Sequence, residues 1–376
     1  MKLYDINELC ENIDRIASYD ITNNKVFGSA YYVYCDGKEI EKYYGKKSLN
    51  SNSLVTNDTI YRLASMTKPI TAVATLILVE RGLLSLDDKV DKFLPEFSRV
   101  KIIDENGNVS EPEKIPTIRN ILSHSSGIAS IAQKTTKMTP ADKKSLDANI
   151  AFSLKEGLDY EPGTKQIYSG TSAYSVLTKI IELTTGSDYL SFLKKEIFTP
   201  CEMPDTTFLP TEEQRNRMID MSLKKDDKIQ IHEMPKGCVF QDFPSTCYLG
   251  GAGLVSTLRD YANFAKMLLH KGKTNSTEIL KEQTFNQLCT PQLSKDIMLG
   301  HTQWGFGVRV ITDESYPTLP KGCYGWSGAY GSHFWIDPTN NIVAVFMKNA
   351  ASDGGAGNES ARNFEKAIYY REKEER

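Results

Sequence analysis

A serine and a lysine stand three residues apart at the start of a long apolar run, in the stretch RLASMTKPIT at residues 62–71. On a helix, positions i and i+3 share a face, so Ser65 would present its hydroxyl beside the amine of Lys68. Free backbone N–H groups and the helix dipole in the first turn favour negative charge on a nearby oxygen. The pair could therefore be a nucleophile and its proton partner. The same spacing also arises by chance in proteins of this length, so the pair alone does not decide the matter.

The residues behind this pair favour the chemical interpretation. Pro69 fixes the backbone in the first turn of a helix, and the run that follows, ITAVATLILV, is almost wholly apolar. A helix that is apolar on all sides has to be buried. A lysine at the start of such a helix is desolvated, which is one of the conditions that lower its pKa.

Five stretches of the chain form a collinear set. They are RLASMTKPITAVATLILVERGLLSLDDKVDKFLPEF (62–97), ILSHSSGI (121–128), EPGTKQIYSG (161–170), GGAGLVSTLRDYANF (250–264) and GWSGAYGSHFWIDP (325–338). In this order they resemble the serine β-lactamase and penicillin-binding-protein superfamily, in its branch of class C β-lactamases, D-amino-acid peptidases and β-lactamase-like esterases. The set spans nearly the whole chain and is far more specific than any single stretch.

The resemblance assigns three catalytic roles. In this superfamily the serine of an S-x-x-K motif is acylated, the lysine is its proton partner, and the tyrosine of a Y-x-N motif completes the base; the matching residues here are Ser65, Lys68 and Tyr168. An unassisted hydroxyl is a poor nucleophile and must lose its proton as it attacks. For the tyrosine or the lysine to take that proton at pH 7, a pKa near 10 must fall by about 3 units. We therefore expect Tyr168 and Lys68 to act as a coupled pair.

A third motif, Lys-Thr-Gly or His-x-Gly in the superfamily, lies on an edge strand beside the site and corresponds here to Trp326, Ser327 and Gly328. Its glycine lets a substrate approach the strand, although a glycine beside a tryptophan could equally serve packing. The resemblance places the oxyanion hole at the backbone N–H groups of Ser65 and Ala329. We expect the three motif residues to line the substrate site.

Two departures from the superfamily pattern bear on the substrate. Trp326 replaces the motif lysine, which removes a cation for a substrate carboxylate and offers an apolar face instead. Gly170 replaces the asparagine of Y-x-N, which removes a side-chain amide from the substrate site that this position is expected to line. The same tryptophan motif is similar to that of the esterase members, which cleave simple esters or pass the acyl group to an alcohol.

The main expectation is therefore a serine hydrolase that cleaves, or transfers the acyl group of, a carboxylic ester through an acyl-enzyme on Ser65. One alternative is a β-lactamase or D-amino-acid peptidase acting on amides, which the two departures disfavour. Another is a non-catalytic descendant of the fold that binds a ligand in the same cleft. The presence of Ser65, Lys68 and Tyr168 argues against that second alternative.

Strand patterns stand at both ends of the chain and helical patterns between them. The strand patterns are VFGSAYYVYC (26–35), EIEKYYG (39–45), FGVRVI (306–311), SHFWID (332–337) and NIVAVFMKN (341–349). They predict an α+β, β-lactamase/transpeptidase-like fold, in which an antiparallel sheet built from both chain ends is flanked by helices. We expect a single catalytic unit over 1–376, with an α/β part at approximately 1–80 and 291–376 and a mostly helical inserted lobe at approximately 81–290.

Composition sets further expectations. The chain has 376 residues, a formal charge of −3, and 40% hydrophobic and 25% charged residues, which is ordinary for a globular enzyme. Without a basic stripe it is not expected to bind nucleic acid, and no apolar run is long enough to cross a membrane. The N-terminal residues lack the pattern of a secretory signal, which predicts a cytoplasmic protein acting on a small-molecule ester or amide. The sequence does not indicate an oligomeric state.

Cysteines and histidines are dispersed without the spacings of a metal site, so no metal or other cofactor is expected. His124 lies in a matched stretch but is expected to belong to a loop that braces the helical lobe. His333 follows the third motif closely, and strand alternation does not settle whether it faces the site. Gly250, Gly251 and Gly253 are expected to form a tight turn beside the pocket.

Overall fold

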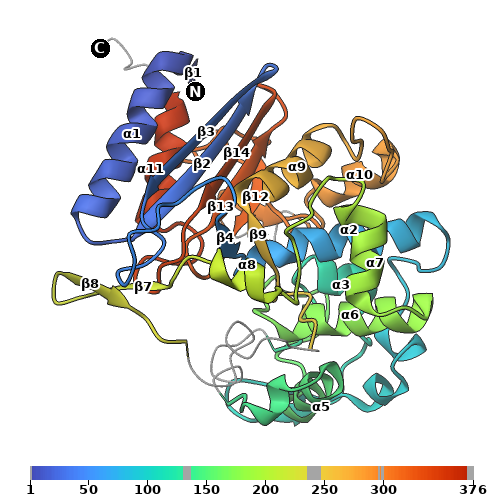
Figure 1. The fold of residues 1–376 in the computed structure, drawn as a ribbon. Helices are drawn as coiled ribbons and strands as arrows, with labels where there is room; N and C mark the ends of the chain where they lie inside the picture. The colour runs from blue at the N-terminus through green and yellow to red at the C-terminus, as the bar shows by residue number, and fades with distance from the viewer. Residues whose placement is uncertain (1, 130–136, 235–246, 295–296, 298–299, 371–376) are drawn as a thin grey trace.

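The computed structural model describes residues 2–129, 137–234, 247–294, 297 and 300–370. Its centre is a seven-stranded antiparallel sheet in the order β10-β11-β12-β13-β14-β2-β3, which joins the two ends of the chain (Figure 1). The strands are β2 (Gly28–Cys35), β3 (Lys38–Gly45), β10 (Thr302–Trp304), β11 (Arg309–Ile311), β12 (Tyr324–Ser327), β13 (His333–Asp337) and β14 (Ile342–Met347). The predicted β-lactamase-like α+β class is confirmed.

The N-terminal hairpin forms where the sequence predicted it. Asp36 and Gly37 both have positive φ, 47° and 81°, as a two-residue type I′ turn between β2 and β3 requires. The hairpin joins the late strands through β14, with Val33 opposite Ala344. The chain ends therefore meet in the middle of one sheet, and the residues between them must leave it and return.

One face of the sheet is covered by α1 (Ile6–Thr22) and α11 (Glu359–Ile368), which lie side by side in Figure 1. Asp5 caps α1 by accepting hydrogen bonds from the backbone N–H groups of its first turn. Leu9 and Ile13 of α1 and Phe364 of α11 belong to an apolar layer against this face. Beside these helices, β1 (Lys2–Leu3) pairs with β15 (Tyr369–Tyr370), which joins the two ends of the described chain.

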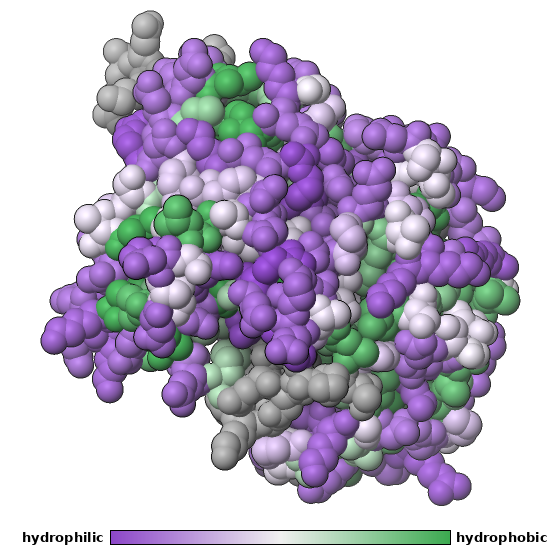
Figure 2. Space-filling view, viewed as in Figure 1, coloured by the Kyte–Doolittle hydropathy of each residue, from purple (hydrophilic) through white to green (hydrophobic). Residues whose placement is uncertain are grey.

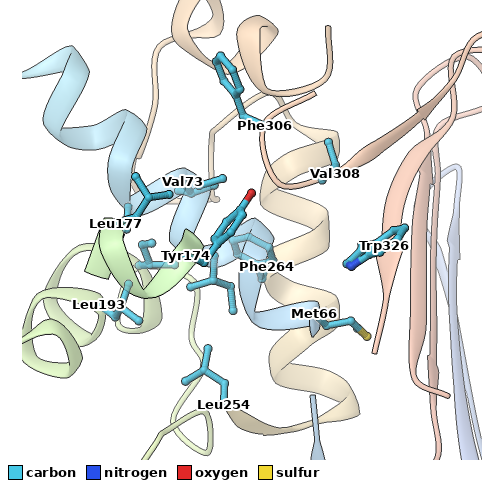
Figure 3. Packing of buried hydrophobic residues seen from close by; sticks show 14 of the residues in the cluster. Met66, Val73, Tyr174, Leu177, Leu193, Leu254, Phe264, Phe306, Val308 and Trp326 are labelled. Carbon is cyan, nitrogen blue, oxygen red and sulfur yellow. The ribbon is translucent and has the colours of Figure 1, made fainter. Parts of the chain in front are cut away.

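The opposite face carries the larger core. The helix α2 (Thr67–Glu80) is buried over the whole span Thr67–Leu78, as its apolar sequence predicted. The helix α9 (Leu258–Leu269) lies directly on β13, β14 and β2, although the sequence assigned this segment to the inserted lobe. In Figure 3, Trp326 extends from its strand toward these helices, which places the third motif on this face of the sheet.

The remaining elements form the helical lobe beyond α2. Its helices are α3 (Ile118–Leu122), α5 (Leu146–Glu156), α6 (Ser172–Thr185), α7 (Tyr189–Leu193), α8 (Glu212–Asn216) and α10 (Glu282–Leu288). Short strands pair within or against it, namely β4 (Ile60–Arg62) with β9 (Val255–Thr257), β5 (Ile102–Ile103) with β6 (Val109–Ser110), and β7 (Ser222–Lys225) with β8 (Lys228–Ile231). Because β4 leads directly into the Ser65 turn, its pairing with β9 fixes where that turn begins.

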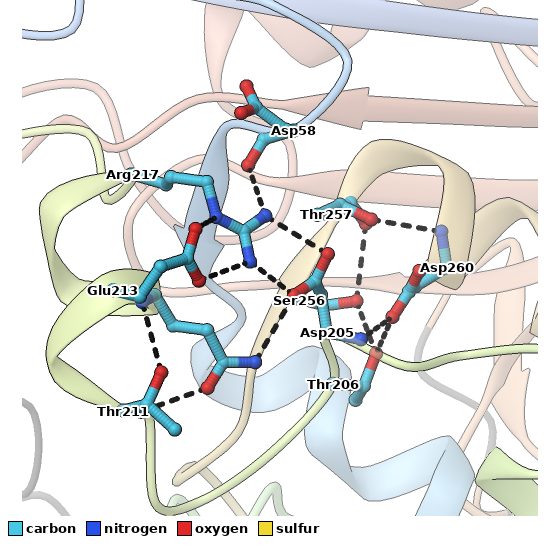
Figure 4. Close-up of polar contacts among 10 residues, drawn as sticks. Asp58, Asp205, Thr206, Thr211, Glu213, Arg217, Ser256, Thr257 and Asp260 are labelled. Carbon is cyan, nitrogen blue, oxygen red and sulfur yellow. Dashed lines mark hydrogen bonds and ion pairs between the residues drawn. The ribbon is translucent and has the colours of Figure 1, made fainter.

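A polar cluster holds the lobe to this small sheet (Figure 4). Arg217 forms an ion pair with Asp205 and donates a hydrogen bond to the backbone carbonyl of Asp58, two residues before β4. Asp260 in the first turn of α9 accepts hydrogen bonds from the Asp205 backbone N–H and the Thr206 hydroxyl. Burial raises the pKa of Asp260 to about 6. These contacts tie three remote segments to the strand that precedes the nucleophile turn.

Hydrophilic side chains cover most of the face seen in Figure 2, as expected for a surface in contact with water. Among the residues described, no helix is both long and apolar enough to cross a membrane.

Candidate active site

Ser65 lies in a short 3-10 turn, η1 (Ala64–Met66), between β4 and α2. The residue before it, Ala64, has φ of +47°, a left-handed conformation that costs a non-glycine residue on the order of 1–2 kcal/mol. The turn is held by its neighbours, since Tyr261 of α9 donates a hydrogen bond to the Met66 carbonyl at 2.9 Å. Backbone strain of this kind collects at functional sites, and here it presents the Ser65 hydroxyl in a half-buried position.

Lys68 is fully buried, and its amine lies 3.4 Å from the Ser65 hydroxyl. It donates to the backbone carbonyls of Gly170 at 2.5 Å and Gly251 at 2.8 Å. Burial holds the pKa of this amine well below its ordinary value. A neutral amine has two hydrogens and one lone pair. With its two hydrogens on the two carbonyls, a neutral Lys68 amine would have its lone pair free to take the Ser65 proton.

Tyr168 touches the same hydroxyl. Its phenol donates to Ser65 Oγ at 2.6 Å and accepts a longer hydrogen bond, 3.4 Å, from the indole N–H of Trp326. Burial raises the pKa of Tyr168 to about 12, although the hydrogen bonds with Ser65 and Trp326 oppose this rise. The sequence required a lowered pKa in one of the two groups, and it is the pKa of Lys68 that is lowered while that of Tyr168 is raised. The phenol is therefore protonated at neutral pH, and the lowered pKa makes the Lys68 amine the better candidate for the base.

Aromatic rings fix the orientation of this phenol. Trp304 of β10 stacks on the Tyr168 ring at 5.5 Å between centroids, and the ring of Trp326 on β12 lies 5.1 Å from it. The two tryptophans also contact each other edge to face at 4.3 Å. Sequence reasoning missed Trp304, because it belongs to no motif and reaches the site only through the pairing of the edge strand β10. Its rarity, as one of three tryptophans in the chain, was the only available signal.

His124 lies beneath the same ring and does not touch Ser65. Its Nδ1 accepts a hydrogen bond from the Ser169 backbone N–H at 3.2 Å, and its backbone carbonyl accepts one from Ile167 at 3.0 Å. Burial, with a smaller contribution from the Lys68 charge, lowers the pKa of this imidazole well below its ordinary value. A neutral ring in this place supports the segment that carries Tyr168, which agrees with the bracing role expected for the loop.

The end of β12 approaches the nucleophile turn very closely. A Cβ on Gly328 would lie 2.4 Å from the Leu63 carbonyl oxygen and 2.3 Å from Ser332 Oγ, so glycine is required there. In the described part of the chain, the backbone N–H groups of Ser65 and Ala329 donate to no protein acceptor. Both flank this contact, which fits the predicted oxyanion hole.

This contact gives a direct prediction. We expect Gly328→Ala to push β12 away from the Ser65 turn, because the two nearest atoms belong to a backbone carbonyl and a buried hydroxyl. The expected cost is about 1–3 kcal/mol in the free energy of unfolding, with a loss of activity larger than that of a distant variant of equal stability. Denaturant unfolding and ester turnover of Gly328→Ala measure both effects. The comparison is Gly322→Ala, where space is open but a φ of +91° strains an alanine, so that it loses stability without a clash against the Ser65 turn. Wild-type activity in Gly328→Ala would show that this approach does not position the site.

Two other predicted site residues are placed differently from each other. Gly170 lies at the site, where its carbonyl holds Lys68 and no atom lies within 4 Å of where a Cβ would stand. The Ser327 side chain does not lie at the site. Strand alternation turns its hydroxyl to the opposite face of the sheet, where it bonds to His333 Nδ1 at 2.8 Å. The prediction that this side chain lines the substrate site is wrong. The same bond shows that His333 faces away from Ser65.

Comparisons with known proteins show the family to which this chain belongs. A family model named Beta-lactamase matches residues 13–366. Esterase EstB of Burkholderia gladioli is 25% identical over 383 residues, which cover 94% of this chain and 93% of that protein. Penicillin-binding protein 4 of Amycolatopsis lactamdurans is 28% identical over 337 residues, with 87% and 82% covered.

Among solved structures, EstCE1, a hydrolase with promiscuous acyltransferase activity, matches with a TM-score of 0.81 at 22% identity. The match covers 97% of this chain and 99% of that one, and at this identity it shows a shared fold. The family model covers almost the whole chain. The protein therefore belongs to the Beta-lactamase family, as a serine hydrolase with the fold of the penicillin-binding proteins.

Proposed function

We propose that the protein cleaves carboxylic esters, or transfers their acyl groups to an alcohol, through an acyl-enzyme on Ser65. The observation that carries this proposal is the environment of Lys68, whose two nearby carbonyls and full burial leave a neutral amine beside the Ser65 hydroxyl. A structural lysine would instead pair with a carboxylate or reach solvent. This environment also disfavours the non-catalytic alternative.

Acylation uses the three side chains in turn. The Ser65 proton passes to the lone pair of Lys68 Nζ as Ser65 Oγ bonds to the ester carbonyl carbon. The carbonyl oxygen becomes an oxyanion and accepts the Ser65 and Ala329 N–H groups. When the C–O bond to the leaving alcohol breaks, Tyr168 gives that oxygen its proton, and the proton held by Lys68 replaces it. The products are the free alcohol and an ester of Ser65.

Deacylation reverses the same path with a new acceptor. A water molecule or an alcohol loses its proton to Lys68 through Tyr168 and attacks the ester carbon, and Ser65 Oγ leaves with a proton. Tyr168 can serve in both directions because its high pKa keeps it protonated between steps. The surroundings of the phenol are aromatic, with Trp304 and Trp326 in contact with its ring, which favours apolar acyl groups or leaving groups.

The third motif supports esters over carboxylate-bearing amides. Trp326 supplies an apolar surface where a lysine would bind a carboxylate. The guanidinium of Arg309 lies 5.8 Å from the indole ring, but it donates to the Tyr316 hydroxyl at 3.2 Å and stands near the buried Glu365. An amide-cleaving activity stays open as the second candidate because a penicillin-binding protein is among the similar proteins.

A matched pair of substrates separates the two candidates. We expect p-nitrophenyl butyrate to be cleaved with a kcat/KM about 10²-fold or more above that for a chromogenic cephalosporin, with an initial burst of p-nitrophenol from acylation. The two leaving groups are followed by absorbance with the same enzyme preparation. Efficient cephalosporin turnover without ester cleavage would favour the amide reading and reject the ester proposal.

Trp326→Lys tests the selectivity argument. We expect the kcat/KM ratio for mono-p-nitrophenyl succinate over p-nitrophenyl butyrate to rise by about tenfold, because the new ammonium attracts the succinyl carboxylate. Both rates fall, since the variant also loses the indole N–H that reaches Tyr168. Trp326→Gln is the matched control, which removes the indole without adding charge. The same ratio in both variants would show that this position does not face the acyl group.

A further inference from the structure

Behind the third motif, on the far face of the sheet, three polar side chains form a buried chain. The Ser327 hydroxyl bonds to His333 Nδ1 at 2.8 Å, and His333 Nε2 bonds to the Glu365 carboxylate at 3.0 Å. Thr318 donates a further hydrogen bond to the same carboxylate. Each of Ser327, His333 and Glu365 is 2% exposed. A carboxylate and an imidazole removed from water in this way are costly, so their place in the fold calls for a physical reason.

These three buried side chains do not form a second nucleophilic site. Serine, histidine and glutamate have the connectivity of a hydrolase triad. A nucleophile must meet its substrate, however, and this chain lies under α11 and against the ring of Trp335, at 5.2 Å from His333. No substrate carbonyl can reach Ser327 without the helix leaving the sheet.

The location of these three side chains indicates another role. Ser327 and His333 are directly opposite each other at the end of the β12–β13 pair, where β12 turns away from the sheet. The residue before Ser327 is Trp326, whose indole donates to Tyr168, and two residues after it stands Ala329 with its free N–H. Beyond this pair the Gly328 N–H bonds to the Ser332 carbonyl at 2.8 Å, and the Gly328 carbonyl accepts from the Gly331 and Gly355 N–H groups. The Ser327–His333 bond is therefore the last bond between side chains across this strand pair before the oxyanion-hole residue.

We propose that Ser327, His333 and Glu365 are positioning residues, which anchor the Trp326–Ala329 segment to α11 and so hold the indole N–H and the Ala329 N–H in place for the reaction at Ser65. This inference rests on the proposed function. None of the three side chains touches Ser65, so none is itself catalytic.

The protonation of the hydrogen-bonded row Ser327–His333–Glu365 follows from its geometry. Burial raises the pKa of Glu365, but the hydrogen bond and the charge of His333, with the Thr318 hydroxyl, outweigh it and leave that pKa below its ordinary value. An ionised carboxylate can only accept, so His333 Nε2 carries a proton. With Nε2 held by Glu365, the ring keeps Nδ1 against the Ser327 hydroxyl, which fixes the direction of that hydroxyl. Replacement of Glu365 by glutamine frees the ring to flip or change tautomer, and the orientation of Ser327 is lost.

The same face of the sheet provides a matched control. Trp335 Nε1 donates to the Tyr369 hydroxyl at 3.3 Å, and that hydroxyl donates to Asp337 at 3.0 Å. This second buried chain also ties β13 to the C-terminal segment, but it lies at the other end of the strand from the third motif. Tyr369→Phe removes one buried hydroxyl from it, as Ser327→Ala does from the first chain.

The test measures how fast Ser65 reacts with a p-nitrophenyl alkylphosphonate, by p-nitrophenol release and intact mass, in the wild type, Ser327→Ala, Ser327→Thr, Glu365→Gln and Tyr369→Phe. We expect Ser327→Ala and Glu365→Gln to react about tenfold or more slowly, with ester kcat lowered and KM little changed, because the oxyanion donor is misplaced. Ser327→Thr, which keeps the hydroxyl, and Tyr369→Phe should stay near the wild-type rate. Unfolding midpoints measured alongside identify losses due to stability alone.

Each outcome of this test supports or overturns the positioning role. Should Glu365→Gln fail to fold, Ser327→Ala, which removes a single oxygen, carries the comparison with Tyr369→Phe. Wild-type rates in Ser327→Ala, or equal losses in Ser327→Ala and Tyr369→Phe at equal stability, would overturn the positioning role and leave the proposed function standing. If phosphonate does not label wild-type Ser65 at all, the proposed function fails and this inference fails with it.

Discussion

Ser65→Ala is expected to lower ester turnover by on the order of 10⁴-fold or more, with the protein still folded. The hydroxyl is the only group in the described site that both Lys68 and Tyr168 contact, at 3.4 Å and 2.6 Å. Its removal leaves a base without a proton to accept and a donor without an acceptor. The steady-state rate with p-nitrophenyl butyrate, and the amplitude of the p-nitrophenol burst, measure the effect.

The control for this variant is another serine with no link to the site. Ser98 is exposed and its hydroxyl donates only to the Pro95 carbonyl, so Ser98→Ala should keep the wild-type rate and burst. The two hydrogen bonds lost at Ser65 are worth about 1 kcal/mol each, so we expect the free energy of unfolding to fall by roughly 2 kcal/mol with the protein still folded. A burst of normal amplitude in Ser65→Ala would show that the acyl group is carried elsewhere.

Lys68→Met is expected to lower kcat by about 10²- to 10⁴-fold, the range typical of the loss of a general base. Methionine keeps much of the buried volume and removes the lone pair that faces Ser65. Lys68→Arg should be equally inactive, although it keeps a cation, because a guanidinium does not release its proton near neutral pH. Activity close to wild type in Lys68→Arg would mean that positive charge, rather than a neutral amine, is what the site needs.

The pH profile tests the same assignment independently. Burial lowers the pKa of Lys68 in the folded protein, and the protonated amine cannot accept the Ser65 proton. The kcat/KM of the wild type should therefore fall as pH drops through this lowered pKa, and rise to a plateau above it. Tyr168, with a pKa of about 12, cannot produce this limb. The same limb in the residual activity of Lys68→Met would assign it to another group.

Much of the fold could be predicted because local pattern and topology agreed. The Asp36-Gly37 turn, the apolar run after Lys68 and the late strands each carry a short-range signal, and each is found where it was expected. The segment at 258–269 was assigned to the lobe because its pattern is only that of an amphipathic helix. Which surface its apolar side meets is decided by the return of β9 beside β4, a long-range contact that no local pattern encodes.

In the candidate site, too, what the sequence motifs carry could be predicted, and what long-range packing decides could not. The motifs brought Ser65, Lys68 and Tyr168 together because their order along the chain carries the resemblance. The Ser327 side chain was misplaced because the strand carrying it alternates faces, and the motif does not say which residue points inward. Burial raises the Tyr168 pKa, and one of the rings in contact with the phenol, Trp304, arrives from an edge strand. The electrostatic role of a residue thus depended on neighbours that the sequence did not identify.

The central claim is that one hydroxyl, activated by a neutral buried amine, forms a covalent intermediate. The most direct measurement is mass spectrometry of the protein after reaction with a p-nitrophenyl alkylphosphonate, followed by peptide mapping, in the wild type and Lys68→Met. We expect one adduct per chain on Ser65 in the wild type and greatly slowed labelling in Lys68→Met. An adduct on any other residue, or Ser65 labelling at the wild-type rate without the Lys68 amine, would contradict the account.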